Sequence, residues 1–93
     1  MQLNLERSDY RPSGPRQRSR GLLGTATLHI GGLVVRFVSV RVTKSGRRSI
    51  SFPKRRFPND RECAVVFPPT REEHAEIERA VLKWIDQREG AKR

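Results

Sequence analysis

The sequence has very few of the residues that build disulfides, metal centres or membrane spans. Cysteine occurs once, at Cys63, in 93 residues, so no internal disulfide can form. The two histidines, His29 and His74, do not lie at metal-ligand spacing from it. No apolar run approaches the roughly 18 residues of a membrane-spanning helix, and residues 1–6 do not read as the start of a signal peptide. These absences predict a cytoplasmic protein without a metal or another cofactor.

Catalytic constellations are missing as well. The sequence shows no carboxylate pair at useful spacing, no nucleophile with a partner base and no phosphate-binding glycine loop. It therefore predicts a binding protein and not an enzyme.

Positive charge is abundant, and it is unevenly distributed. Lys and Arg total 20 against 10 Asp and Glu, which gives a net charge of +10. Residues 1–61 carry 14 basic and 3 acidic side chains, a net charge of +11, whereas residues 62–93 carry 6 and 7, a net charge of −1. A positive field confined to one part of a small chain is typical of proteins that meet a nucleic acid or an anionic surface.

Alternation of apolar and polar side chains predicts most of the chain to be β-structure. The expected strands span residues 2–6, 22–30, 33–42, 48–52 and 62–67. Gly31-Gly32 is typical of a tight hairpin between the second and third of these. In the third strand the apolar residues change from odd to even positions near Phe37, which indicates either a β-bulge or two partly covered faces. A dimer contact would cover the second face.

The C-terminal segment predicts a helix over residues 70–89. Thr70 and Glu73 have the spacing of a capping box, and Gly90 is expected to end the helix. An apolar stripe that includes Ile77, Val81 and Trp84 would pack on the sheet. The sequence thus predicts one α+β domain over residues 1–93, with a small antiparallel sheet of four to five strands and a C-terminal helix packed on it.

The main candidate site is a basic triplet between two prolines, Lys54, Arg55 and Arg56. Pro53 and Pro58 lack a backbone N–H, so we expect the triplet to form a presented loop outside any regular strand. For a charge run the ordinary interpretation is a solvated face, but the flanking prolines and the basic context favour contacts with phosphate.

Other arginines are expected to extend this site. Residues 8–20 are rich in arginine, proline and glycine and predict a flexible connection, whose arginines can follow a phosphate backbone. Arg47 is expected at the end of a turn and Arg48 at the start of the next strand, where a phosphate contact and a merely solubilising role are equally open. The candidate nucleic-acid-binding residues are Lys54, Arg55, Arg56, Arg47, Arg48, Arg16, Arg18 and Arg20. Phe57 has two interpretations, a ring that stacks on an unpaired base and, preferred here, a corner packed on the core.

Several short motifs, in order over residues 25–84, resemble the family of stage V sporulation protein G, the bacterial septation regulator. They are Thr27-Leu28, Leu33-Val34-Val35 with Val38 and Val40, Phe52-Pro53-Lys54-Arg55-Arg56, Arg61-Glu62 and Ala80-Val81-Leu82. The resemblance implies an α+β homodimer joined through strands. It also implies a regulator in cell division and sporulation that binds DNA, and RNA as well, and that is not an enzyme.

The chain departs from the family pattern in two places. The longer arginine-rich segment 8–20 replaces the first hairpin, and His29-Ile30-Gly31-Gly32 stands where the family carries acidic residues. Both departures favour binding to a polyanion.

Together these features predict a dimeric nucleic-acid-binding regulator that contacts the phosphate backbone. We expect weak sequence specificity, because phosphate contacts do not read bases and no recognition helix is visible. Two alternatives stay open. One is a protein-interaction module for an acidic partner in septation regulation, and the other is an RNA-chaperone or ribosome-associated protein.

Overall fold

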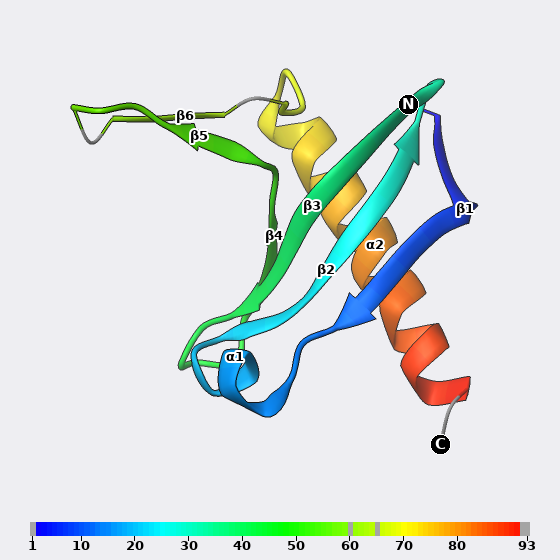
Figure 1. Ribbon diagram of the computed structural model, residues 1–93. Helices are drawn as coiled ribbons and strands as arrows, with labels where there is room; N and C mark the ends of the chain where they lie inside the picture. The colour runs from blue at the N-terminus through cyan, green and yellow to red at the C-terminus, as the bar shows by residue number, and fades with distance from the viewer. Residues whose placement is uncertain (1, 60, 65, 92–93) are drawn as a thin grey trace.

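The computed structural model describes residues 2–59, 61–64 and 66–91, which form an α+β fold (Figure 1). The elements follow one another as β1 (Leu3–Pro12), α1 (Pro15–Ser19), β2 (Leu22–Ile30), β3 (Leu33–Val42), β4 (Arg48–Ser51), β5 (Lys54–Arg56), β6 (Glu62–Ala64) and α2 (Arg71–Ala91). The expected fold class is confirmed: an antiparallel sheet of four strands carries a C-terminal helix.

The four-stranded sheet is a meander in the order β1-β2-β3-β4, and β5 and β6 form a separate two-stranded hairpin that projects from it (Figure 1). The reversal between β2 and β3 pairs Ile30 with Leu33 across Gly31 and Gly32. Both glycines have positive φ, +52° and +75°, which residues with a side chain rarely adopt. The hairpin predicted at this dipeptide is confirmed.

One face of the sheet is buried under α2. Leu28, Val38 and Val40 from the sheet and Val81 from the helix are the largest fully buried side chains. Ile77 and Ile85 complete the helix contribution. Their spacing of four residues places all three helix residues on one stripe, as the sequence pattern predicts.

Trp84 lies at the margin of this contact and not at its centre. Its side chain is partly buried and packs against the core cluster. The Arg88 guanidinium lies 5.0 Å from the centroid of the ring, which is a cation–π contact.

The two ends of α2 differ in how well the sequence predicts them. At the start, the Glu73 N–H donates to Thr70 Oγ1 at 3.1 Å, and the Thr70 hydroxyl lies 3.5 Å from Glu73 Oε1, so the expected cap is present. At the other end the helix continues to Ala91, so the expectation that Gly90 ends it is wrong.

Residues 8–20 are ordered into two elements, which corrects the expectation of a flexible connection. Residues 8–12 belong to β1, and Pro15 begins the short helix α1. Two buried side chains with polar groups hold this segment on the sheet, and a pattern of apolar residues does not reveal them. Tyr10 is buried and its hydroxyl donates to the Leu23 carbonyl at 3.1 Å, while buried Ser8 accepts the His29 N–H at 3.0 Å.

The basic triplet is also more regular than expected. Residues Lys54–Arg56 form β5 and pair with β6, so the prediction of a loop outside any regular strand is wrong. Pro53 and Pro58 lie just outside the paired residues, and the missing N–H groups therefore cost the hairpin no ladder bond. The strand expected over residues 62–67 is shorter, since β6 ends at Ala64. Val65 lies outside the described residues.

A pair of leucines on the covered face of the sheet tests how far along that face the contact with α2 extends. Leu28 is fully buried and Leu33, on the neighbouring strand, is 70% exposed. We expect Leu28→Ala to lower the free energy of unfolding by about 2 to 5 kcal/mol, because it leaves a cavity under α2. Leu33→Ala should change it by no more than about 0.5 kcal/mol. Chemical denaturation followed by circular dichroism measures both, and equal losses would contradict this packing.

Candidate functional site

The face of the sheet opposite α2 is not covered by any described element, and we call it the open face. Its side chains alternate with the buried ones along each strand. They are Asn4, Asp9 and Arg11 on β1, Thr25, Thr27 and His29 on β2, Val34, Arg36, Phe37, Ser39 and Arg41 on β3, and Ser49 and Ser51 on β4. The cross-strand register supports this assignment, since it pairs open-face residues with one another except where a register shift places Arg41 opposite Leu22.

A β-bulge at Phe37 is the most unusual backbone feature of the open face. β2 and β3 pair at Leu28 with Val35 and next at Ala26 with Val38, so two residues of β3 oppose one of β2. Phe37 has φ of +62°, in the left-handed region. For a residue with a large side chain this conformation costs on the order of 1 to 3 kcal/mol.

This bulge explains the change of phase seen in the sequence. Val35 and Val38 are three residues apart and both are buried. The extra residue turns the side chain of Phe37 outward, where 72% of it is exposed, more than any other large apolar side chain among the described residues. Of the two interpretations left open by the sequence, the bulge is therefore confirmed.

Cationic side chains flank Phe37 on both sides. One shallow pocket, of about 390 Å³, is lined by Phe37 together with Arg11 and Arg36. A second, of about 490 Å³, is lined by Phe37 together with Arg41 and Lys54. Phe37 is thus the shared wall of two hollows, each of which carries two basic side chains.

Little negative charge opposes these cations. Asp9 is the one acidic side chain that lines either pocket, counting the described residues. It is shared between Arg11, at 4.0 Å, and Arg88 at the end of α2, at 3.5 Å. Among the described residues, Arg36 and Arg41 form no ion pair. Their guanidinium groups are therefore available to an anionic ligand.

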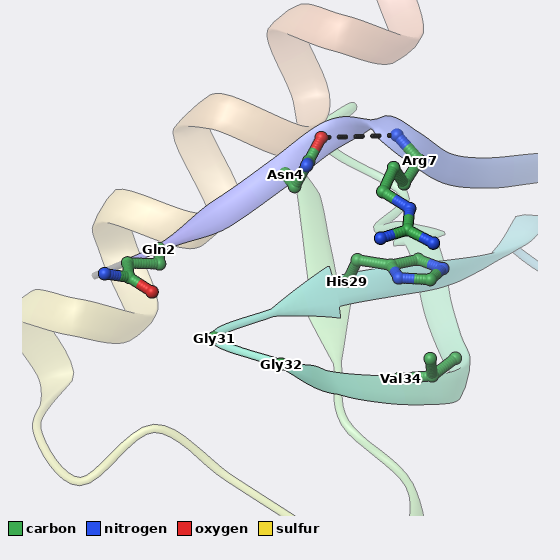
Figure 2. Close-up of a pocket in the computed structure, with 7 residues that line it drawn as sticks. All are labelled: Gln2, Asn4, Arg7, His29, Gly31, Gly32 and Val34. Carbon is green, nitrogen blue, oxygen red and sulfur yellow. Dashed lines mark hydrogen bonds between the residues drawn. The ribbon is translucent and has the colours of Figure 1, made fainter.

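A third hollow lies at the Gly31-Gly32 end of the open face (Figure 2). β1 pairs with β2 at Asn4 and again only at Asp9, so residues 5–8 bulge away from the ladder. The Arg7 N–H donates to Asn4 Oδ1 at 3.3 Å, which fixes the bend. Figure 2 shows the Arg7 side chain directed toward His29, and both line the same pocket of about 350 Å³. This bulge adds a further guanidinium group to the open face.

The basic triplet lies only in part at this site. Lys54 is exposed and borders the pocket beside Phe37. For Arg55 and Arg56 the structure describes the backbone of β5 but not the side chains. Phe57 is 40% exposed, so the preferred interpretation of this ring as a core residue is wrong.

The other predicted arginines gather elsewhere. Arg16, Arg18 and Arg20 are exposed on α1 and its C-terminal end, and Arg47 is exposed in the turn between β3 and β4. Both segments lie at one end of the sheet, whereas the β5–β6 hairpin projects from the opposite end (Figure 1). The structure therefore divides the predicted site into two groups of cations.

Arg48 has a structural partner. Its guanidinium forms two parallel hydrogen bonds to the Asp86 carboxylate, at 2.7 and 2.9 Å, and so joins β4 to α2. This bidentate contact lowers the pKa of Asp86 and raises that of Arg48. Arg48 thus helps to hold the helix on the covered face, although the sequence places it beside Arg47.

Sequence reasoning missed the open-face arginines and the exposed role of Phe37. The missed residues are Arg7, Arg11, Arg36, Phe37 and Arg41. The sequence held a signal for them, because arginines at outward positions of a strand mark its solvent-facing side. That signal can be recognised only when the register of the strands is known. The basic triplet attracted attention because its three charges are consecutive in the sequence.

No family model, curated protein or solved structure matches the chain, so its resemblance to the family of stage V sporulation protein G stays a prediction. Among the described residues, no helix is long and apolar enough to cross a membrane. No group of three or more His, Cys, Asp or Glu side chains in that part of the chain could hold a metal ion.

The left-handed backbone at Phe37 makes an unusual prediction about stability. Valine is among the best strand formers, but its branched side chain fits a positive φ poorly. We expect Phe37→Val to lower the free energy of unfolding by roughly 1 kcal/mol, whereas Phe37→Asn should leave it nearly unchanged, since asparagine tolerates this conformation. Thermal and urea denaturation of the two variants provide the measurement. A more stable Val variant would mean that the bulge is absent.

The ion pair between Arg48 and Asp86 predicts a pH dependence. Because the folded pKa of Asp86 lies below its ordinary value of 3.8, the stabilisation is present above that value and is lost as the pH falls through the folded pKa. Both partners are partly exposed, so we expect Arg48→Gln to cost only about 0.5 to 1 kcal/mol at neutral pH. Unfolding free energies measured at neutral pH and below pH 3.8 should show this difference shrinking in acid.

Asp86→Asn is the matched variant for Arg48. It removes the partner and leaves the arginine in place, so it should cost about as much stability. If Arg48 did not hold the helix, Asp86→Asn would leave the free energy of unfolding unchanged.

Proposed function

We propose that the chain is a nucleic-acid-binding protein that holds the phosphate backbone of DNA or RNA on the open face of its sheet. The observation that carries this proposal is the cluster of Arg11, Arg36, Arg41 and Lys54 around Phe37, opposed by one carboxylate among the described lining residues. On the other side of the molecule, α2 carries six acidic and four basic side chains. The charge that would attract a polyanion is therefore concentrated on the sheet side.

Arginine suits this role because its planar guanidinium donates two parallel hydrogen bonds to phosphate oxygens. Arg36 and Arg41 lie on the same strand, and because the bulge takes one residue out of the ladder they are four ladder steps, or about 13 Å, apart along β3. This separation is long enough for the two side chains to contact different phosphates of one strand. Such contacts position a nucleic acid without reading its sequence, so binding should be tolerant of sequence.

A second copy of the chain would strengthen such binding. Two linked cationic faces make the second contact intramolecular and raise the overall affinity without new chemistry. The resemblance to the septation-regulator family supports a homodimer joined through strands and a regulatory role in the cytoplasm, and we include both in the proposal.

A protein partner is the second candidate, favoured by a different observation. An apolar groove of about 170 Å³ runs between the end of β2 and the start of α2, lined in part by Leu33 and Phe67. These two side chains are 70% and 64% exposed. Exposed apolar surface of this kind is typical of protein contacts, and the groove is separate from the cations around Phe37.

A charge-removal experiment tests the proposal. The double variant Arg36→Gln, Arg41→Gln should bind DNA duplexes more weakly than the wild type does, and the loss of affinity should not depend on the sequence of the duplex. Its plot of log affinity against log salt should be less steep by about 0.9 for each phosphate that the protein no longer neutralises. Fluorescence anisotropy at a series of salt concentrations measures both quantities.

The matched control is Arg79→Gln, Lys83→Gln, which removes the same charge from exposed positions of α2. It should keep most of the affinity. If both double variants lost the same affinity, binding would depend on net charge and not on the open face. No binding by the wild type at low salt would refute the proposal. Replacing Lys54, Arg55 and Arg56 by alanine in the same titration measures the share of the β5 residues.

A further inference from the structure

We infer that the preferred ligand of the open face is a single-stranded nucleic acid, one of whose bases stacks on the ring of Phe37. This inference rests on the proposed function. It adds the strandedness of the ligand and the residue that recognises it.

The fold gives the side chain of Phe37 no structural task. The core contacts of β3 are made by Val35 and Val38 on either side of it, and both are buried. The position has a φ of +62°, which glycine or asparagine adopts more readily than phenylalanine. A large aromatic ring at a strained and 72% exposed position is therefore explained better by a ligand than by stability.

Positive charge lies on both sides of the Phe37 ring. Arg11 and Arg36 line the hollow on one side of Phe37, and Arg41 and Lys54 line the hollow on the other. A base stacked on the ring would place the phosphates before and after it toward these two pairs. An aromatic platform between cations is the arrangement by which sheet surfaces bind single strands.

Stacking selects the single strand over the duplex. The bases of a duplex are stacked on one another and paired inside it, so a ring on a sheet surface reaches them only after unstacking. An unpaired base is available at no such cost. The phosphate contacts can form with a single strand and with a duplex, whereas the stacking contact with Phe37 can form only with a single strand.

The charges also argue against a second copy as the occupant of this face. In a two-fold contact the same patch meets itself, so Arg36 and Arg41 would approach the arginines of the partner subunit. Like charges held face to face are destabilising. A polyanion complements this surface, whereas a copy of the chain repels it.

The test compares two ligands of equal length, a fluorescein-labelled oligo(dT) and a random-sequence DNA duplex, by anisotropy at one salt concentration. We expect the wild type to bind oligo(dT) more tightly than the duplex. Phe37→Asn should weaken oligo(dT) binding roughly tenfold, the contribution of about one stacked base, and should leave duplex binding unchanged. Since no charge is removed, the salt dependence should stay the same for both ligands. Phe37→Tyr should bind as the wild type does.

The matched control is Leu33→Asn, which removes an equally exposed apolar side chain from the far end of the same strand. It should change neither affinity. Thermal denaturation checks that each variant is folded. If Phe37→Asn does not fold, photocrosslinking of wild-type protein to an oligonucleotide with 5-iodouracil, read by mass spectrometry, should identify Phe37 as the crosslinked residue.

The outcomes separate this inference from the function on which it rests. Failure of the wild type to bind either ligand at low salt would refute both. Binding of both ligands with equal affinity, unchanged oligo(dT) binding in Phe37→Asn, or a crosslink at another residue would overturn the inference alone. A shift from dimer to monomer in Phe37→Asn, measured as mass in solution, would identify the face as an interface between copies and would also overturn it.

Discussion

Burial of one face of the four-stranded sheet under α2 is the contact on which the rest of the structure depends. Leu28, Val38 and Val40 are fully buried in one cluster with the stripe of α2 centred on Val81. In a chain of this length the core is small, so few residues can be spared from it. One helix can cover one face only. The opposite face is therefore left to solvent, and its residues are free to be selected for binding.

The bulge in β3 connects the covered face with the open one. If the strand continued in one phase, the residues that follow Val35 on the covered face would be Phe37 and Ser39, and Val38 and Val40 would point to solvent. One extra residue restores two valines to the core and turns Phe37 outward. The strain at Phe37 is offset by this burial. The same feature thus serves packing on one face and, in our proposal, recognition on the other.

Three arginines illustrate how the fold assigns different roles to one residue type. Arg48 lies on the covered side of β4 and is bound to Asp86. Arg36 and Arg41 lie on the open side of β3 and form no ion pair among the described residues. Their neighbours in the sequence do not distinguish them. Only the strand register and the position of α2 decide which arginine supports the fold and which can meet a ligand.

The sequence by itself determined the α+β class, the hairpin at Gly31-Gly32 and the capped start of α2, because each depends on residues close together in the chain. It also determined the excess of positive charge, which is a matter of composition. It also indicated the bulge near Phe37, as one of two interpretations. It did not reveal that residues 8–12 extend β1, because Ser8 and Tyr10 are held by partners on β2 that lie far away in sequence. The composition of the open face was decided by the tertiary structure alone, since pairing of β1, β2 and β3 brings together cations that the chain keeps far apart.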